Sequence, residues 1–341
     1  MTETKPFIPN GDRKVLVLGA GGFIGGHLVK QLVDDGDNVV AVDIKPMSKW
    51  HQVTTQSIDL FDAGDPDRLR ELGEYHFDEV YNLAADMGGM GFIEGNKLAC
   101  MLSVLTSTNV LRAARDYGWD KVIYSSSACV YPAYIQNDQT HVDNLDLELS
   151  EDQAYPAEPE DGYGWEKLFS ERMHRHFKEE TSVDTRVVRF HNIYGTHGTW
   201  DGGREKAPAA LCRKVATAKL SGTRAVEIWG DGSQLRSFCY VDDAVKGIVM
   251  VGRGEYGHPV NVGSSELVTI NRLLEIITEI AGYVVEKHYV PGALGVKGRS
   301  SDNTLIKDLF GWEPSISLQD GLAMTYAWIE EEVAQEMRRN G

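Results

Sequence analysis

Three side chains in the middle of the chain could together carry out hydride transfer at an alcohol carbon. Ser127 follows a predicted strand, Lys121–Tyr124, and would lie at the carboxyl end of that strand. Tyr163 and Lys167 are four positions apart, so on a helix they face the same side. A hydroxyl, a phenol and an ammonium in one site can take the proton of a sugar hydroxyl while hydride leaves its carbon.

Each of the three would have its own role. Tyr163 would be the general base, and Lys167 would lower the pKa of the phenol and hold the ribose of a nicotinamide. Ser127 would hydrogen-bond the reacting oxygen. Ser125 and Ser126 stand beside it, so the register of the serine run stays open, and a surface helix pair is the alternative for Tyr163 and Lys167.

A thiol stands two positions after Ser127, at Cys129. A thiol near a lysine can act as a base when its pKa falls from about 8.5 towards neutrality. Oxidation at C4 of a sugar makes the hydrogens at C3 and C5 acidic, so a base on one face and an acid on the other could invert those carbons. The alternative is that Cys129 is a small buried apolar residue.

The acid partner should be a lysine or a similar donor. The segment 202–209 reads Gly-Gly-Arg-Glu-Lys-Ala-Pro-Ala, in which two glycines permit close backbone approach to a ligand and Lys206 begins a predicted helix. The residues alone do not rank Lys206 above Arg204 or Lys214.

A glycine-rich turn after the first predicted strand is typical of a dinucleotide site. The turn reads Gly19-Ala-Gly-Gly22-Phe23-Ile24-Gly25 and opens a predicted helix, so its backbone N–H groups can approach a pyrophosphate. Asp43 ends the second predicted strand, where a carboxylate accepts ribose hydroxyls and would repel a 2′-phosphate, which favours NAD over NADP. Asp59 is a candidate for the edge of the adenine.

The elements that must position these residues alternate between strands and helices. Short apolar strands are predicted at 15–18, 39–42, 79–83, 121–124 and 185–190, and helices at 97–117 and around Tyr163. This alternation predicts an α/β fold with a Rossmann-type doubly wound parallel sheet and a smaller C-terminal α/β substrate lobe. We expect a flexible N-terminus at 1–12, a cofactor domain at 13–190, and a substrate lobe mainly over 191–341, with the return of 241–262 to the cofactor domain as an alternative.

Bulk properties exclude several classes of protein. The 341 residues carry a formal net charge of −17, which argues against nucleic acid as a partner. No apolar run reaches the about 20 residues that a membrane span needs. The four cysteines are scattered without metal-ligand spacing, so we expect reduced thiols in a cytoplasmic protein, with no metal site.

Several motifs together are similar to those of the GDP-mannose 3,5-epimerases, a family within the extended short-chain dehydrogenase/reductases. The resemblance covers about residues 14 to 330, and the Met-Gly-Gly-Met-Gly loop and the Ser-Ala-Cys motif are specific to that family. It rests on the segments 82–93, 126–132, 156–159, 189–195, 202–209 and 298–303.

The resemblance implies that Cys129 and Lys206 are the acid/base pair for C3 and C5, and that Tyr163 and Lys167 serve C4. It also implies a homodimer built through a four-helix bundle. The residues that it places at the GDP-sugar are Gly88, Ser127, Ala128, Cys129, Tyr163, Asn192, Glu205, Lys206, Ala207, Lys214, Gln234, Arg236, Ser237 and Arg299. Arginine and lysine suit a diphosphate, because they offer bidentate or point-charge donors.

The chain departs from the family pattern at Glu94, where the family has Gln, at 98–104, and around 219–223. The first departure flanks the catalytic loop, so the sugar accepted, or the balance of C3 and C5 inversion, could differ.

The sequence thus predicts a redox-neutral epimerase with bound NAD, converting GDP-mannose to GDP-L-galactose, GDP-L-gulose or both. A nucleotide-sugar 4-epimerase is one alternative. A 4,6-dehydratase is disfavoured, because Ala128-Cys129 stands where such enzymes have an Asp-Glu pair. An NAD-sensing scaffold on a dehydrogenase fold is the non-enzyme alternative.

Overall fold

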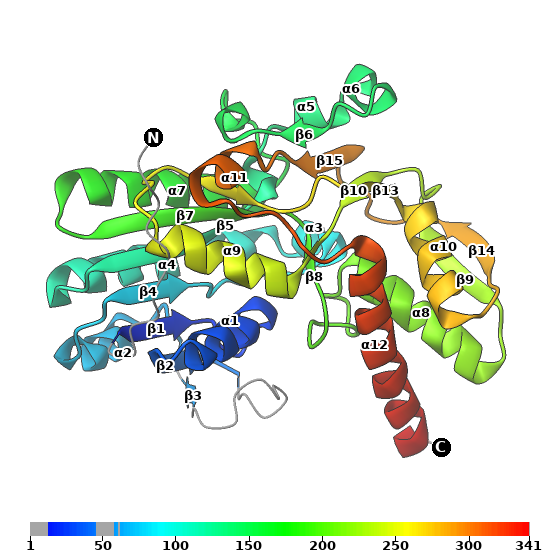
Figure 1. The fold of residues 1–341 in the computed structure, drawn as a ribbon, viewed down its shortest axis with the longest axis horizontal. Coiled ribbons are helices and arrows are strands. Elements are labelled where there is room, and N and C mark those ends of the chain that lie inside the picture. The colour runs from blue at the N-terminus through cyan, green and yellow to red at the C-terminus, as the bar shows by residue number, and fades with distance from the viewer. Residues whose placement is uncertain (1–12, 46–57, 61, 341) are drawn as a thin grey trace.

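The computed structural model describes residues 13–45, 58–60 and 62–340, and its centre is a seven-stranded parallel sheet (Figure 1). The strand order is β12-β7-β5-β4-β1-β2-β3, and every neighbouring pair runs in the same direction. The strands are β1 (Lys14–Leu18), β2 (Asn38–Asp43), β3 (Ile58–Leu60), β4 (Glu79–Asn82), β5 (Lys121–Ser127), β7 (Asp184–Phe190) and β12 (Val260–Val262).

Helices cover both faces of this sheet, because alternate side chains of each strand point to opposite sides. Val15 and Val17 of β1 belong to a core with Leu28 of α1, whereas Leu16 and Leu18 belong to a second core. The flanking helices are α1 (Phe23–Asp34), α2 (Pro66–Glu71), α4 (Lys97–Tyr117), α7 (Gly162–Glu180), α9 (Val241–Arg253) and α11 (Thr304–Phe310), and the short α3 (Met90–Gly95) precedes α4. The predicted doubly wound α/β fold is therefore confirmed.

The remaining elements form smaller layers beside the carboxyl ends of the strands. A four-stranded sheet has the order β13-β10-β15-β6, and two-stranded sheets pair β14 with β9 and β11 with β8. The strands are β6 (Glu148–Leu149), β8 (Ile193–Tyr194), β9 (Ala225–Trp229), β10 (Leu235–Ser237), β11 (Cys239–Tyr240), β13 (Leu267–Thr269), β14 (Glu286–Val290) and β15 (Gly298–Ser301). The helices are α5 (Ala133–Asn137), α6 (Gln139–Asp143), α8 (Ala207–Ser221), α10 (Ile270–Ala281) and α12 (Leu318–Asn340), and short 3-10 turns occur at Leu72–Glu74, Ala128–Val130 and Glu151–Ala154.

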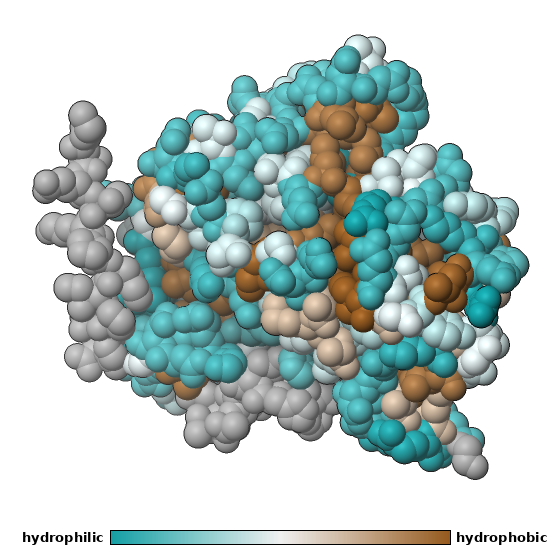
Figure 2. Space-filling model, turned by 45° about the vertical axis from the view of Figure 1, so that its right-hand side comes forward, coloured by the Kyte–Doolittle hydropathy of each residue, from teal (hydrophilic) through white to brown (hydrophobic). Residues whose placement is uncertain are grey.

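The surface is polar on the face that Figure 2 shows. In Figure 2 most of the face is hydrophilic, and hydrophobic residues gather into a band that runs down from the hydrophilic tip formed by α5 and α6. Among the residues that the structure describes, no helix is long and apolar enough to cross a membrane.

The structure tests the helix predicted at 97–117 and the strand predicted at 121–124. The helix predicted at 97–117 is confirmed residue for residue. The strand predicted at 121–124 was too short, since β5 continues to Ser127 by pairing with β7 up to Phe190. The polar serines hid this extension, because they interrupt the apolar run that marks a buried strand. The division into a cofactor domain and a substrate lobe stays a prediction, although β12 lies in the main sheet.

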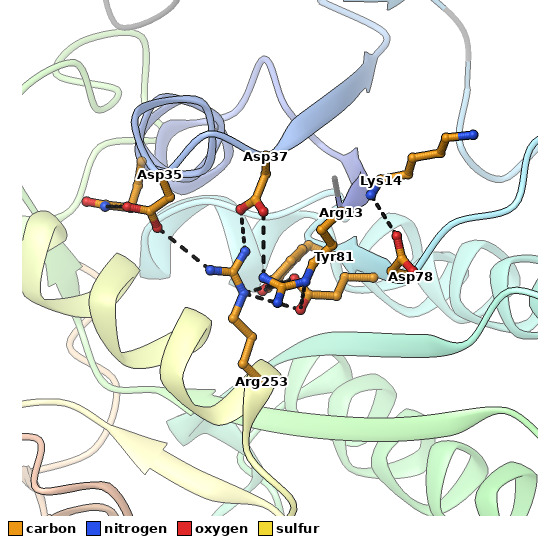
Figure 3. Close-up of polar contacts among 9 residues, drawn as sticks. Arg13, Lys14, Asp35, Asp37, Asp78, Tyr81 and Arg253 are labelled. Carbon is orange, nitrogen blue, oxygen red and sulfur yellow. Dashed lines mark hydrogen bonds and ion pairs between the residues drawn. The ribbon is translucent and has the colours of Figure 1, made fainter. Parts of the chain in front are cut away.

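Buried charges tie the amino ends of the strands to α9, as Figure 3 shows. Arg253 at the end of α9 pairs with Asp37 and with Glu79, whose Oε1 lies 3.2 Å from Nε. Arg13 lies 3.4 Å from the same carboxylate, and the Tyr81 hydroxyl donates to Glu79 over 3.0 Å. This network fixes the end of the sheet opposite the predicted site, whose residues follow the carboxyl ends of β1, β2 and β5.

Candidate active site

The turn between β1 and α1 has no room for side chains at its glycines. A Cβ on Gly25 would lie 2.0 Å from the carbonyl oxygen of Gly19, and a Cβ on Gly22 would lie 3.0 Å from the same oxygen. Gly19 itself has φ +84°, and a Cβ there would lie 2.8 Å from the backbone of Ala84. The chain therefore makes its tight turn and its close helix–strand approach only because these residues are glycine.

The amino end of α1 is open to an anion. Gly22 precedes the first helical residue, no side chain caps the helix, and no acidic residue lies in its first turn. The predicted cofactor residues Phe23 and Ile24 begin this helix, so their N–H groups are among those that have no partner within the helix. Backbone donors and the helix dipole together favour a pyrophosphate here.

Asp43 lies beside this turn at the end of β2. Its Oδ2 accepts the N–H of Gly21 over 2.8 Å, and its Oδ1 accepts the N–H of Lys45 over 2.8 Å. These bonds hold the carboxylate in place and leave lone pairs for ribose hydroxyls. The turn and Asp43 thus fit a dinucleotide. Asp59 lies in β3, but its side chain is outside the part of the chain that is described.

The three serines at the end of β5 point in different directions, which removes the doubt about register. Ser125 donates to the carbonyl of Asn82 over 3.1 Å, and Ser126 donates to Glu171 over 2.5 Å. Ser127 accepts the N–H of Cys129 over 3.2 Å and also hydrogen-bonds Tyr163, which acts to lower the pKa of that phenol. Ser127 is therefore the serine that faces the predicted reaction site.

Tyr163 is held against Cys129 by the residue that follows it. A Cβ on Gly164 would lie 2.2 Å from the carbonyl oxygen of Cys129, so α7 can touch the Ala128–Val130 turn only with glycine at this position. Asp161 caps α7 by accepting the N–H of Gly164 over 2.9 Å. The sequence analysis missed the role of Gly164, which the Tyr-Gly pair at the start of the helix could have indicated.

Lys167 lies one turn further along α7 and is almost fully buried. Its Nζ donates to the carbonyl of Ser125 over 3.0 Å and lies 5.6 Å from the centre of the Tyr163 ring. Burial lowers the pKa of Lys167, while the carboxylate of Glu166, 3.7 Å away, acts to raise it. Glu166 is a second residue that sequence reasoning missed.

The surroundings of Tyr163 oppose loss of the proton from its phenol. Burial, and then the neighbouring Cys129 and Glu166, raise the pKa of Tyr163 well above 10. A nearby cation such as Lys167 is needed before the phenol can serve as a base.

Cys129 lies in the turn after β5 and is 7 % exposed. The Nη1 of Arg299 lies 3.5 Å from its Sγ. Tyr163, Lys206 and Arg236 are close enough for the charge on Cys129 to act on their pKa values. A thiolate here would have cations around it, which is the setting in which thiols become reactive. The other three cysteines, Cys100, Cys212 and Cys239, are buried.

The structure separates Lys206 from its two sequence rivals. Arg204 pairs with Asp86 over 2.6 Å and stacks on the ring of Phe92, and Lys214 donates to the carbonyl of Glu227 over 2.8 Å. Within the described residues the ammonium of Lys206, which precedes α8, has no hydrogen bond or ion pair. Burial lowers the pKa of Lys206, and Cys129 opposes that change.

Two arginines predicted to bind the substrate lie side by side on paired strands. Arg236 of β10 is in register with Arg299 of β15. Burial, and then the charge of Arg299, lower the pKa of Arg236 to about 10. Positive charges placed this close favour an anion such as a diphosphate between or beside them.

The remaining predicted substrate residues divide into three groups. Oε1 of Gln234 and Oγ of Ser237 are buried and have no hydrogen bond within the described chain, whereas Asn192 donates to the carbonyl of Ser237 over 3.0 Å. Glu205 is engaged by the N–H of Gly203 and by Arg213. Three others have backbone roles that the structure makes visible: Gly88 packs on Phe92, Ala128 is buried, and Ala207 begins α8. Whether these residues contact a substrate stays a prediction.

Comparisons with known proteins agree on one family. The model of the NAD-dependent epimerase/dehydratase family matches residues 15–263. GDP-mannose 3,5-epimerase 1 of Oryza sativa subsp. indica is 42% identical over 336 residues, which cover 98% of this chain and 86% of that protein. GDP-mannose 3,5-epimerase of Arabidopsis thaliana is 41% identical over 337 residues, with the same coverage of 98% and 86%.

Solved structures show the same fold. UDP-glucose 4-epimerase of Thermotoga maritima, solved with UDP-glucose, superposes with a TM-score of 0.83 at 26% identity, covering 94% of this chain and 99% of that one. MoeE5, solved with UDP-glucose and NAD, gives a TM-score of 0.79 at 27% identity, with coverage of 94% and 99%.

Proposed function

Because the chain belongs to the NAD-dependent epimerase/dehydratase family and is a nucleotide-sugar epimerase, we propose that it acts on GDP-mannose and inverts C5 and C3 of the sugar. The cofactor is NAD; the turn at 19–25 and Asp43 would hold it, and when bound it would supply a reversible hydride acceptor for C4 of the sugar. The rest of the chemistry belongs to side chains of this chain.

At C4 we assign the proton to Tyr163. Its phenol lies beside Ser127, which would hydrogen-bond the same sugar oxygen, and Lys167 supplies the positive charge that favours the phenolate. Tyr163 takes the proton of the C4 hydroxyl during oxidation and gives it back during reduction. The hydrogen bond from Lys167 to Ser125 keeps the ammonium near the phenol throughout.

At C5 and C3 we assign proton transfer to Cys129 and Lys206. The 4-ketone makes these hydrogens acidic, so the thiolate of Cys129 removes a proton from one face and the ammonium of Lys206 delivers one to the other. Each inversion takes one proton from the sugar and returns one, and the proton on Cys129 passes to Lys206 through solvent before the next inversion. The cycle has no net redox change because the hydride taken from C4 is returned to it. The observation that carries the proposal is that Lys206, brought from a distant segment, lies near Cys129 without another partner in the described chain.

The test is incubation with GDP-mannose in deuterated buffer, with and without added NAD, followed by NMR of the recovered sugar. Deuterium at C5 and C3 with altered ring couplings supports the double inversion, and deuterium at C5 alone indicates the gulose configuration. A new sugar without deuterium would indicate a 4-epimerase, and no new sugar in either arm contradicts the proposal.

A variant separates the two halves of the reaction. Cys129→Ala removes the proposed base, so we expect deuterium incorporation to fall by about 10²-fold or more while oxidation at C4 persists. Oxidation is followed by NADH absorbance in a single turnover. Epimerisation retained by this variant would remove Cys129 from the mechanism.

We further propose that the protein forms a homodimer through α4 and α7. The two helices pack side by side and present large apolar side chains between 46% and 72% exposed. These side chains are Leu98, Met101, Leu102 and Leu105 of α4, and Trp165 and Phe169 of α7. Within each helix these side chains are three or four residues apart, so they form one continuous apolar face. A second copy of the protein would cover this face. Light scattering on the wild type and on Leu105→Glu tests this, since the variant should be monomeric.

A further inference from the structure

Glu160 is a carboxylate at the site that the proposed chemistry does not use. It precedes Asp161, the capping residue of α7, on a loop pinned against the turn that carries Cys129. A bridge pairs Pro159 with Pro132, and Ala133 donates its N–H to the carbonyl of Glu158 over 2.9 Å. These contacts hold the backbone next to Glu160 against the segment that follows the Cys129 turn.

One guanidinium connects this carboxylate to the thiol. Arg299 is 6 % exposed and has three partners on three segments. Its Nε donates to Gln136 over 2.5 Å, its Nη1 lies 3.5 Å from Sγ of Cys129, and its Nη2 lies 3.7 Å from Oε2 of Glu160. Gln136 fixes the orientation of the guanidinium, so Nη1 faces the thiol of Cys129 and Nη2 faces the carboxylate of Glu160.

The negative charge of the Glu160 carboxylate is only weakly compensated by its neighbours. Its Oε2 is buried, and among the described residues no donor hydrogen-bonds to it. Burial raises the pKa of Glu160, while Arg299 acts to lower it. The other charged groups that act on the pKa of Glu160 are Asp161, Arg236 and Glu94. The groups around Cys129 are Tyr163, Lys206 and Arg236, whose pKa values its charge affects, and Arg299, which contacts its Sγ.

We propose that Glu160 is a positioning residue that competes with the Cys129 thiolate for the charge of Arg299, and so sets how much of Cys129 is ready to act as a base. This inference rests on the proposed function of Cys129. While Glu160 is ionised, part of the positive charge of Arg299 is neutralised by it. When that negative charge is removed, the same guanidinium stabilises the thiolate more strongly.

The experiment measures the thiolate directly and needs no turnover. Iodoacetamide alkylates thiolates, so the rate of alkylation at Cys129 is followed against pH by peptide mass spectrometry, which separates it from the other three cysteines. The variants are Glu160→Gln, which keeps the shape and removes the charge, and Glu160→Asp, which keeps the charge. Glu158→Gln is the matched control, because Glu158 is exposed on the same loop.

For Glu160→Gln we expect the pH midpoint of alkylation to fall by about 0.5–1 unit. Glu160→Asp should stay near the wild type, and Glu158→Gln should not move. An unchanged or higher midpoint for Glu160→Gln overturns the inference. An equal fall for Glu158→Gln also overturns it, since the cause would then be net charge alone. Thermal unfolding of each variant shows that the comparison is between folded proteins.

Failure of this inference is distinguishable from failure of the proposed function. If the wild type inverts GDP-mannose but the midpoint does not move, only the role of Glu160 is wrong. If the midpoint moves but no deuterium enters any sugar carbon, the coupling of Glu160 to Cys129 stands and the epimerase assignment is wrong.

Discussion

The cofactor turn and the proposed proton-transfer cluster lie at the same edge of the sheet but are built in different ways. The turn at 19–25 is continuous in sequence and consists of backbone whose glycines leave no space for a Cβ. The cluster of Cys129, Lys206, Arg299 and Glu160 comes from four separate segments and consists of charged or ionisable side chains.

This difference predicts opposite sensitivities. A site made of tightly packed backbone should fail when atoms are added, whatever their charge. A site made of side-chain charges should tolerate a change of size and fail when a proton or a charge is lost. The variants below test each half of this contrast.

The largest effect should come from Gly25→Ala. The added methyl carbon would lie 2.0 Å from the carbonyl oxygen of Gly19, so the strand, the turn or the helix must move. We expect loss of bound NAD and a loss of about 1–3 kcal/mol in the free energy of unfolding, the usual range for overpacking. NAD released from the purified protein and denaturant unfolding measure the two effects.

The matched control for this prediction is Gly95→Ala at the end of α3, where a Cβ has nothing within 4 Å. It should keep NAD and full stability. If Gly25→Ala also keeps both, the turn is more adaptable than its packing indicates, and the contrast between the two regions fails.

The second effect should come from Lys206→Met, which keeps the length of the side chain and removes its proton. We expect deuterium exchange at C5 and C3 to fall by about 10²–10⁴-fold, the usual contribution of a general acid, while NAD stays bound. The control is Lys219→Met on α8, whose ammonium pairs with Glu330 and is remote from the site. An equal loss of deuterium exchange in both variants would mean that the substitutions disturb the packing of α8, and that Lys206 is not the proton donor.

The cofactor half of the fold could be predicted from the sequence because each part is local. Gly19, Gly22 and Gly25 follow an apolar strand, and Asp43 ends the next strand, so the neighbours along the chain are also the neighbours in space. The helix at 97–117 was predicted for the same reason, since its apolar periodicity is contained within it.

The proton-transfer half could not be assembled from the sequence. The approach of Arg299 to Cys129 depends on β15 pairing with β10 and on Gln136 orienting the guanidinium. No spacing along the chain encodes such contacts. The sequence therefore offered three equal candidates for the acid, Arg204, Lys206 and Lys214, until the structure showed their partners. The resemblance to a known family named the residues of this cluster, but the sequence did not show how they are arranged in space.

The smallest effect should come from Asp86→Asn, which weakens the ion pair that joins the loop before α3 to Arg204, two residues before Lys206. Both side chains of this pair are about two-fifths exposed, at 44% and 40%, so the pair is worth about 1 kcal/mol or less. We therefore expect deuterium exchange at C5 to slow by about five-fold at most, with unchanged NAD content.

Salt distinguishes this loss from general damage to the loop. An exposed pair is screened as ionic strength rises, so the difference between wild type and Asp86→Asn should shrink between low and 0.5 M salt, where the Debye length falls to about 4 Å. Asp67→Asn on α2, remote from the site, is the control and should show no difference at any salt concentration. A loss much larger than five-fold that salt does not change would mean that Asp86 contacts the substrate itself, and the loop would then belong to the reacting cluster rather than to its support.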